Sequence, residues 1–227
     1  MAISDSLQVT KNRIAAACVA AGRPPEEVQL LVVSKTFPAS AVREAFEAGA
    51  CAFGENYVQE GLAKIVELID LRGRIEWHLI GPLQSNKTRP VAEQFDWVHS
   101  VDRLKIAERL NEQRPAELPP LNVCLQVNIS GEASKSGLLP DDVAALAQQV
   151  AALPRLRLRG LMAVPEPGPG ALAQHQAMAA LFGRLQRQGL ALDTLSLGMS
   201  ADLEDAIAAG STMVRVGSAI FGARGAR

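Results

Sequence analysis

The sequence predicts an α/β fold, a single closed (β/α)8 barrel, and three observations support this. Short apolar runs alternate with longer amphipathic stretches along the whole chain. Eight of these runs have the length of strands, and strands that alternate with helices form a parallel sheet. The 227 residues suit one domain, 1–227, and no linker divides them. A doubly wound open sheet is the alternative, because a strand count from sequence can be wrong by one.

The elements follow one another without long gaps. Residues 5–21 form an amphipathic stretch that predicts an additional N-terminal helix, ended by Gly22 and the Pro24-Pro25 turn. The short apolar runs predict strands at 29–34, 50–53, 75–80, 95–99, 122–129, 156–163, 192–197 and 212–216. The stretches between them predict helices at about 39–48, 56–70, 85–93, 102–113, 141–152, 171–188 and 201–209, with a short one from 218. Loops 130–137 and 165–170 follow strands, so they belong to the C-terminal face, where barrels carry their active sites.

Side chains alternate along each strand, and this sorts them between the helix layer and the lumen. Placing apolar residues such as Trp77 and Leu79 against the helices leaves polar residues inside. The polar residues directed inward near the C-terminal strand ends are Lys35, His78, Asn128, Ser196 and Arg215. Buried polar groups are unfavourable unless they are paired or bind something. The pattern therefore favours a polar ligand, and the alternative is that these residues pair with one another or reach solvent.

Lys35 ends the first apolar strand and has two interpretations. It could be a solvated lysine at the rim. It could instead be a Schiff-base amine, whose pKa must fall from about 10.4 toward neutrality before it reacts. Burial and a nearby cation such as Arg215 would both lower that pKa.

Two turns near the C-terminus predict an anion site. Gly198 and Ser200 connect a strand to a helix, and Ser200 suits the N-cap position of that helix. Gly217 and Ser218 open another short helix directly after the last strand. Barrels often bind phosphate with the loops after strands seven and eight. Acidic residues would repel a phosphate, so the nearby Asp202 should point away, as should Glu204.

Four polar residues also have interpretations that involve no ligand. Asn56 is expected to cap a helix rather than contact a ligand, and Lys87 is expected to be a surface lysine. His78 and His99 lack a third metal ligand at a fixed spacing, so packed histidines are favoured over a metal site.

The composition excludes several classes of protein. The formal net charge of −1 and the absence of basic runs argue against nucleic-acid and membrane-surface binding. The N-terminus has no signal-peptide pattern, and no apolar stretch could span a bilayer. The three cysteines form no metal or disulfide pattern. We therefore expect a soluble, cytoplasmic protein.

Five motifs in chain order resemble one known family. They are Val33-Ser-Lys-Thr36, Phe53-Gly-Glu-Asn-Tyr57, Trp77-His-Leu-Ile-Gly-Pro-Leu-Gln-Ser-Asn-Lys87, Leu197-Gly-Met-Ser-Ala-Asp-Leu203 and Val214-Arg-Val-Gly-Ser-Ala-Ile-Phe-Gly222. The sequence is similar over nearly its whole length to the YggS/PROSC family of pyridoxal phosphate homeostasis proteins. The resemblance implies a TIM barrel like the N-terminal domain of alanine racemase, usually monomeric, with pyridoxal 5'-phosphate (PLP) as cofactor.

The resemblance also implies roles for individual residues. Lys35 would form the Schiff base with PLP, and Arg215 would face the pyridine nitrogen. Ser196 is also expected at the site, because the strand pattern points it into the lumen. The phosphate would be held by Ser200, Gly217 and Ser218, and the ring would be lined by Asn56 and His78. The sequence departs from some relatives at Phe37, where they have a second lysine, and in its lysine-free tail 222–227.

Binding PLP requires an amine, an anion cradle and a partner for the ring nitrogen. An arginine opposite that nitrogen would leave it without a proton, which weakens the electron sink. Racemisation also needs an acid/base group on each face of the substrate, and Tyr57 is the only tyrosine. We therefore expect a PLP carrier, not an enzyme, that acts in vitamin B6 homeostasis and contacts apo PLP enzymes transiently. A weak PLP-dependent amino-acid racemase and a PLP-free Schiff-base aldolase are the alternatives.

Overall fold

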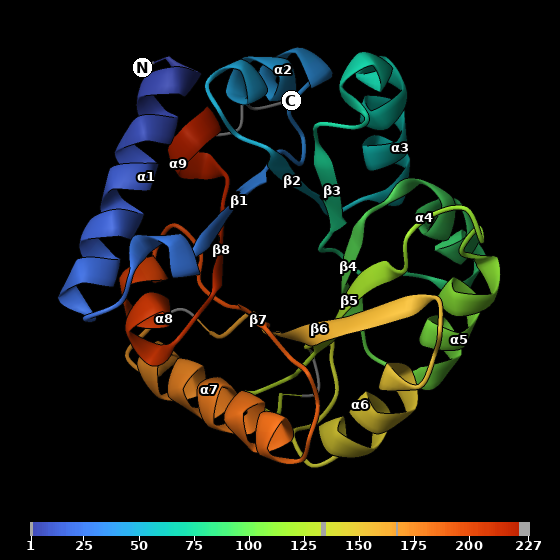
Figure 1. The fold of residues 1–227 in the computed structure, drawn as a ribbon. Coiled ribbons are helices and arrows are strands. Elements are labelled where there is room, and N and C mark those ends of the chain that lie inside the picture. Colours follow the sequence, from blue (N-terminus) through green and yellow to red (C-terminus); the bar gives the residue numbers. More distant parts are fainter. Residues whose placement is uncertain (1, 133–134, 167, 223–227) are drawn as a thin grey trace.

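The eight predicted strands pair in sequence order and close into a parallel barrel. The computed structural model describes residues 2–132, 135–166 and 168–222, and Figure 1 looks into the barrel with its helices around it. The strands are β1 (Gln29–Val33), β2 (Ala52–Glu55), β3 (Glu76–Leu79), β4 (Trp97–Val101), β5 (Leu121–Gln126), β6 (Leu156–Met162), β7 (Thr194–Ser196) and β8 (Met213–Val216). The barrel prediction is confirmed, and the alternative of an open sheet is wrong because β1 pairs with β8. The assignment of residues 1–227 to one domain stays a prediction.

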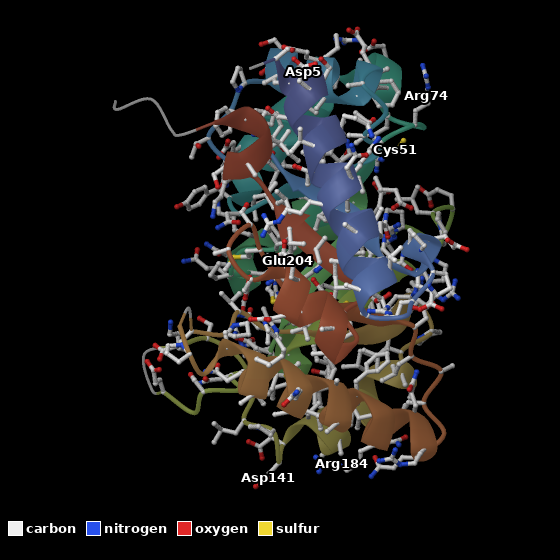
Figure 2. All side chains as sticks on the ribbon, turned by 90° about the vertical axis from the view of Figure 1, so that its left-hand side faces the viewer. Asp5, Cys51, Arg74, Asp141, Arg184 and Glu204 are labelled. Atoms are coloured by element: carbon white, nitrogen blue, oxygen red, sulfur yellow. The ribbon has the colours of Figure 1, made fainter. Side chains whose placement is uncertain are left out.

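The helices surround the strands, as the amphipathic pattern predicts. They are α1 (Ile3–Ala20), α2 (Ala39–Glu47), α3 (Val58–Glu67), α4 (Thr88–Gln94), α5 (Leu104–Gln113), α6 (Val143–Ala151), α7 (Ala171–Arg187), α8 (Leu203–Ala209) and α9 (Ser218–Phe221), with 3-10 turns η1 (Pro25–Glu27), η2 (Ile69–Leu71) and η3 (Ser85–Lys87). In Figure 2, α1 lies against α8 and α9, where Arg13 of α1 pairs with Glu204 of α8. Within the described residues, no helix combines the length and the apolar character needed to cross a membrane.

Three strands, β2, β4 and β7, begin two residues later than predicted. The apolar run at 50–53 suggested the second strand, but β2 begins at Ala52. The Ala50 N–H donates to Ala45 O and so belongs to the turn that ends α2. The fourth strand was expected at 95–99, but the Phe95 N–H donates to Val91 O at the end of α4, and β4 begins at Trp97. The Asp96 carboxylate accepts a hydrogen bond from the Trp77 N–H at 2.8 Å and two from Arg72.

The lumen and the helix layer divide as side-chain alternation predicts. Val32, Phe53 and Trp77 belong to the large core between the barrel and the helices. A small cluster of Leu31, Ala52 and Met213, with Ile80 against it, fills one part of the lumen. A second cluster of Trp97, Cys124 and Met162 fills another part. The polar side chains that remain inside are therefore surrounded by apolar groups, which makes their hydrogen bonds the main determinant of their positions.

Candidate functional site

A cavity of about 430 Å³ opens at the C-terminal ends of the strands. Its wall is formed by Val33, Lys35, Phe37, Asn56, Ile80, Val164, Met199, Ser200, Ala201, Arg215, Gly217, Ser218 and Gly222. These residues come from the ends of β1, β2, β3, β6, β7 and β8 and the segments that follow them. This is the end of a (β/α)8 barrel at which active sites are found.

Six of the eight residues predicted from the sequence lie in this wall. They are Lys35, Asn56, Ser200, Arg215, Gly217 and Ser218. The other two, His78 and Ser196, are fully buried and do not line the cavity. They belong to a hydrogen-bonded group that ends on Arg215.

Arg215 is held rigidly at the floor of the cavity. Its Nη1 donates to the carbonyl oxygen and to Oγ of Ser196, both at 2.7 Å. Its Nη2 donates to the carbonyl oxygen of Ala163 at 2.8 Å. These contacts use three of its five N–H groups, which leaves two that can be directed toward a ligand. Burial lowers the pKa of Arg215 to about 10, so the guanidinium is still charged at neutral pH.

The turn after β7 matches the prediction at Gly198 and differs at Ser200. Gly198 has φ +90°, and a Cβ there would lie 2.5 Å from the Cβ of Ala206, so only glycine fits. The predicted N-cap role of Ser200 is wrong, because α8 begins at Leu203 with Asp202 as the N-cap residue. The intervening residues form a turn in which the Met199 N–H donates to Asp202 Oδ1 at 2.7 Å. Ser200 is thereby left in the cavity wall.

The two acidic residues near this turn are bound to other partners, as expected. Asp202 lies 2.9 Å from Nε2 of the buried His175, and Glu204 pairs with Arg13 on α1. The contacts with His175 and the Met199 N–H lower the pKa of Asp202 against the opposing effect of burial. Both carboxylates are therefore occupied by protein partners, and neither acidic residue lines the cavity.

Gly217 allows the chain after β8 to pass close to β1. A Cβ at this position would lie 2.8 Å from the carbonyl oxygen of Val33. Ser218 follows as the first residue of α9. The Ile220 and Phe221 N–H groups donate to Gly217 O, so the N–H groups of Ser218 and Ala219 are the ones that could be offered to an anion.

Asn56 lies in the cavity wall rather than at a helix cap. The predicted capping role is wrong, because α3 begins at Val58 and its N-cap residue, Tyr57, makes no side-chain capping bond. The segment at Asn56 is packed closely against the next loop, since a Cβ on Gly81 would lie 2.0 Å from the Asn56 carbonyl oxygen.

The two lumen histidines, His78 and His99, are packed against other side chains, which is the interpretation that the sequence favoured. The His78 ring stacks on Trp97 with centroids 5.1 Å apart, and its Nδ1 lies 2.9 Å from Nε2 of His99. The described residues contain no group of three metal-ligating side chains.

Asn128 donates to the Glu132 carbonyl oxygen at 2.7 Å, so it holds its own loop. Residues 133–134 and 167 of the two predicted loops lie outside the described residues.

The sequence interpretation did not name seven members of the wall as site residues, and these are Val33, Phe37, Ile80, Val164, Met199, Ala201 and Gly222. Three of them lie at the rim. Phe37 stacks on Phe221 with centroids 4.8 Å apart, and Val164 and Met199 are partly exposed at the rim. Each follows a predicted strand by a few residues, and this position at the C-terminal face was the signal that could have identified them.

Comparison with known proteins gives a consistent result. Residues 8–225 match the family described as alanine racemase, N-terminal domain. A protein of Pseudomonas aeruginosa named pyridoxal phosphate homeostasis protein is 63% identical over 222 residues, which cover 98% of this chain and 96% of the relative. A protein of the same name from Escherichia coli K12 is 58% identical over 226 residues, covering 98% and 97%.

Solved structures show the same fold. PipY of Synechococcus elongatus PCC7942, determined with PLP bound, has a TM-score of 0.80 at 41% identity, covering 92% of this chain and 100% of its own. Alanine racemase from Corynebacterium glutamicum has a TM-score of 0.69 at 17% identity, covering 98% of this chain and 62% of its own. The second likeness shows the fold alone.

Proposed function

Because this chain belongs to the alanine racemase N-terminal domain family and, within it, to the pyridoxal phosphate homeostasis proteins, we propose that it binds PLP in the cavity between Lys35 and Arg215. The observation that carries the proposal is the presence of all three groups that PLP requires in one wall. The bound state of PipY supports the same cofactor.

The residues present fit the three parts of the cofactor. Lys35, half-buried directly after β1, would supply the amine for the Schiff base. Gly217, Ser218 and Ser200 would hold the phosphate with backbone N–H groups and hydroxyls. Arg215 would donate to the ring nitrogen from its two remaining N–H groups. Asn56 and the apolar side chains of Ile80 and Val33 would line the ring.

The chemistry of this wall suits storage more than turnover. PLP supplies an aldehyde that an amine captures reversibly. The charged Arg215 only donates hydrogen bonds, so it would keep the ring nitrogen without a proton. Tyr57 is 63% exposed and lies outside the cavity wall, so it is not placed as an acid/base group beside a substrate. The relatives are named for homeostasis rather than for a reaction, which supports a carrier over an enzyme.

We infer that the protein limits free PLP and passes it to apo enzymes in the cytoplasm, acting as a monomer. The cavity is open at the C-terminal face, which would let the cofactor enter and leave without unfolding. Transfer to a purified apo PLP enzyme, followed by recovery of that enzyme's activity, would test the carrier role. Size-exclusion chromatography with light scattering would test the oligomeric state.

The central experiment is chemical labelling of the bound cofactor. The purified protein would be loaded with PLP, reduced with borohydride and mapped by peptide mass spectrometry. We expect the pyridoxyl label on Lys35, its loss in Lys35→Ala and its retention in the matched control Lys87→Ala. A label on another lysine, or none, would overturn the proposal. Exchange at Cα of amino acids by the loaded protein would instead favour the racemase.

A further inference from the structure

Five polar side chains form a line through the barrel lumen from its N-terminal mouth to the cavity. His99 Nδ1 lies 3.1 Å from Ser196 Oγ, which accepts the 2.7 Å hydrogen bond from Arg215. In the other direction, His99 Nε2 lies 2.9 Å from His78 Nδ1. The line ends at Glu76, whose carboxylate lies 3.6 Å from His78 Nε2, an electrostatic contact that is longer than a hydrogen bond. We call these residues, Glu76, His78, His99, Ser196 and Arg215, the lumen chain.

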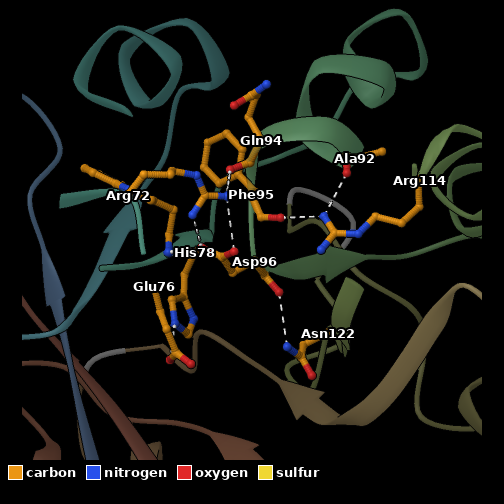
Figure 3. A network of polar contacts seen from close by, with 10 residues as sticks. Arg72, Glu76, His78, Ala92, Gln94, Phe95, Asp96, Arg114 and Asn122 are labelled. Atoms are coloured by element: carbon orange, nitrogen blue, oxygen red, sulfur yellow. Dashed lines mark hydrogen bonds and ion pairs between the residues drawn. The ribbon is translucent and has the colours of Figure 1, made fainter. Parts of the chain in front are cut away.

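Glu76 connects the lumen chain to solvent at the end of the barrel opposite the cofactor cavity. Its side chain is 54% exposed and lines a second cavity, of about 650 Å³, at the start of β3 and β4. Figure 3 shows its carboxylate beside the His78 ring, next to the network of Arg72 and Asp96. Glu93 lines the same second cavity but makes no contact with the lumen chain.

The two ends of the lumen chain have opposite hydrogen-bonding character. Arg215 can only donate, and an ionised Glu76 can only accept. The contact with His78 lowers the pKa of Glu76, so its carboxylate is ionised at neutral pH. Burial lowers the pKa of both histidines, and the pKa of His99 is lowered further because a charge on His99 would be repelled by a charge on His78 and by that of Arg215. Each ring is therefore neutral and carries one hydrogen.

These constraints favour one placement of the hydrogens on Ser196, His99 and His78, the residues between Arg215 and Glu76. Ser196 Oγ accepts from Arg215 and donates its own hydrogen to His99 Nδ1. His99 then carries its hydrogen on Nε2 and donates to His78 Nδ1. The His78 hydrogen, on Nε2, faces the carboxylate of Glu76. The opposite direction would set a lone pair of His78 against that carboxylate, and no acceptor would remain in the lumen chain for the Ser196 hydrogen.

We propose that Glu76, His78 and His99 are positioning residues that fix the direction of hydrogen bonding at Ser196 and so hold Arg215 for the cofactor. In the favoured direction, Ser196 Oγ accepts one hydrogen bond within the lumen chain, and it comes from Arg215. In the reverse direction, Ser196 Oγ would accept hydrogen bonds from both Arg215 and His99, and the guanidinium would be held less firmly. The role assigned to Arg215 toward the cofactor rests on the proposed function, whereas the direction of the lumen chain does not.

Nitrogen NMR of 15N-histidine-labelled protein reads the direction of the lumen chain directly, because the sequence has only three histidines. We expect hydrogen on Nε2 of both His78 and His99. In Glu76→Lys the end group becomes a donor, and both hydrogens should move to Nδ1. Glu76→Gln keeps an acceptor and should retain the original state. Glu93→Lys makes the same charge change in the same cavity and should change neither ring. The inference would be overturned if both ring hydrogens stayed on Nε2 in Glu76→Lys. It would also be overturned if the unmodified protein carried them on Nδ1.

PLP titration then tests whether the direction matters at the cofactor cavity. We expect about tenfold weaker binding and a shifted cofactor absorbance in Glu76→Lys and Ser196→Ala, as for weakening a hydrogen bond to a charged group. In Glu76→Gln, the PLP affinity and the cofactor absorbance should remain those of the unmodified protein. Ser100→Ala removes a buried hydroxyl from the residue beside His99 and should leave both unchanged. If the unmodified protein labels on Lys35 while Glu76→Lys binds PLP normally, the positioning role is wrong and the proposed function stands. If PLP does not label Lys35, the NMR result still decides the direction of the lumen chain.

Discussion

The ammonium group of Lys64 lies 2.7 Å from the carbonyl oxygen of Ser34, the residue that precedes Lys35. The same group contacts Glu55 Oε1 at 2.7 Å and Glu60 Oε1 at 2.8 Å. Glu60 also accepts a hydrogen bond from the N–H of Thr36, the residue that follows Lys35 and has φ +69°. Lys64, only 4% exposed, therefore stabilises the backbone on both sides of the proposed cofactor lysine, including a residue in a strained conformation.

Replacing Lys64 with Met should destabilise the protein by about 3 to 5 kcal/mol, because Glu55 would remain buried without its cation. Burial already raises the pKa of Glu55 against the effect of Lys64. Urea unfolding measures the change. Lys105→Met, at an exposed position on α5, is the control and should change stability by less than about 0.5 kcal/mol. Equal effects of the two substitutions would contradict the role of Lys64.

Gly217→Ala should weaken both folding and PLP binding. The added Cβ would lie 2.8 Å from the Val33 carbonyl oxygen, so β1 and β8 would have to move apart beside Lys35. We expect a loss of about 1 to 3 kcal/mol, as for other overpacked sites. Thermal unfolding and a PLP titration measure the two effects. Gly73→Ala is the matched control, since a Cβ there meets nothing within 4 Å.

Arg215→Gln should change the absorbance of the bound cofactor more than it changes the affinity for phosphate. The proposed contact of Arg215 is with the ring nitrogen, whereas the phosphate would be held by Ser200, Gly217 and Ser218. Absorbance spectra of the loaded protein and competition by inorganic phosphate provide the two measurements. An equal loss of both would show that Arg215 binds the phosphate instead.

Acid should destabilise the protein through its two lumen histidines. Burial lowers the pKa of His78 and His99 in the folded state below the usual value near 6.5. Below that pH the unfolded chain takes up protons that the folded chain does not, so the unfolding free energy falls as pH falls. Each histidine contributes a slope of up to about 1 kcal/mol per pH unit.

Urea unfolding between about pH 7.5 and 5.5 measures this slope around the usual histidine pKa. His99→Gln should make it shallower, because one titrating ring is removed. The raised pKa of Glu55 has the opposite sign but is common to both proteins, so it cancels in the comparison. Identical slopes would show that His99 titrates alike in the folded and the unfolded chain, which would contradict the lowered pKa.

The three cysteines should differ sharply in reactivity. Cys51 is exposed, whereas Cys18 and Cys124 are buried. Burial raises the pKa of Cys124 to about 12 and also raises that of Cys18, so neither forms the reactive thiolate at neutral pH. A thiol reagent such as DTNB should modify one cysteine rapidly in the native protein, and Cys51→Ser should abolish that phase. A second rapid phase would mean that Cys18 or Cys124 becomes accessible in solution.

Local patterns were enough to predict much of the architecture. The alternation in 29–34 placed Leu31 in the lumen, where it packs with Met213, because successive side chains of any strand point to opposite sides. Positions at strand ends also identified Lys35, Arg215 and Gly217 as neighbours in one wall. Caps and strand starts were less predictable. The start of β4 was predicted too early because Phe95, although apolar, still belongs to the end of α4, where its N–H donates to Val91 O.

The sequence by itself therefore determined the barrel, the face that carries the cavity and, through five motifs, the family. Only the tertiary structure decided which buried polar groups bond to one another. His99 and Ser196 are 97 residues apart, and Lys64 reaches Ser34 from a helix 30 residues away. Such contacts depend on closure of the barrel and on the packing of α3 against it. Strand and helix periodicity report only which side of its own element a residue occupies, so they carry no information about these distant partners.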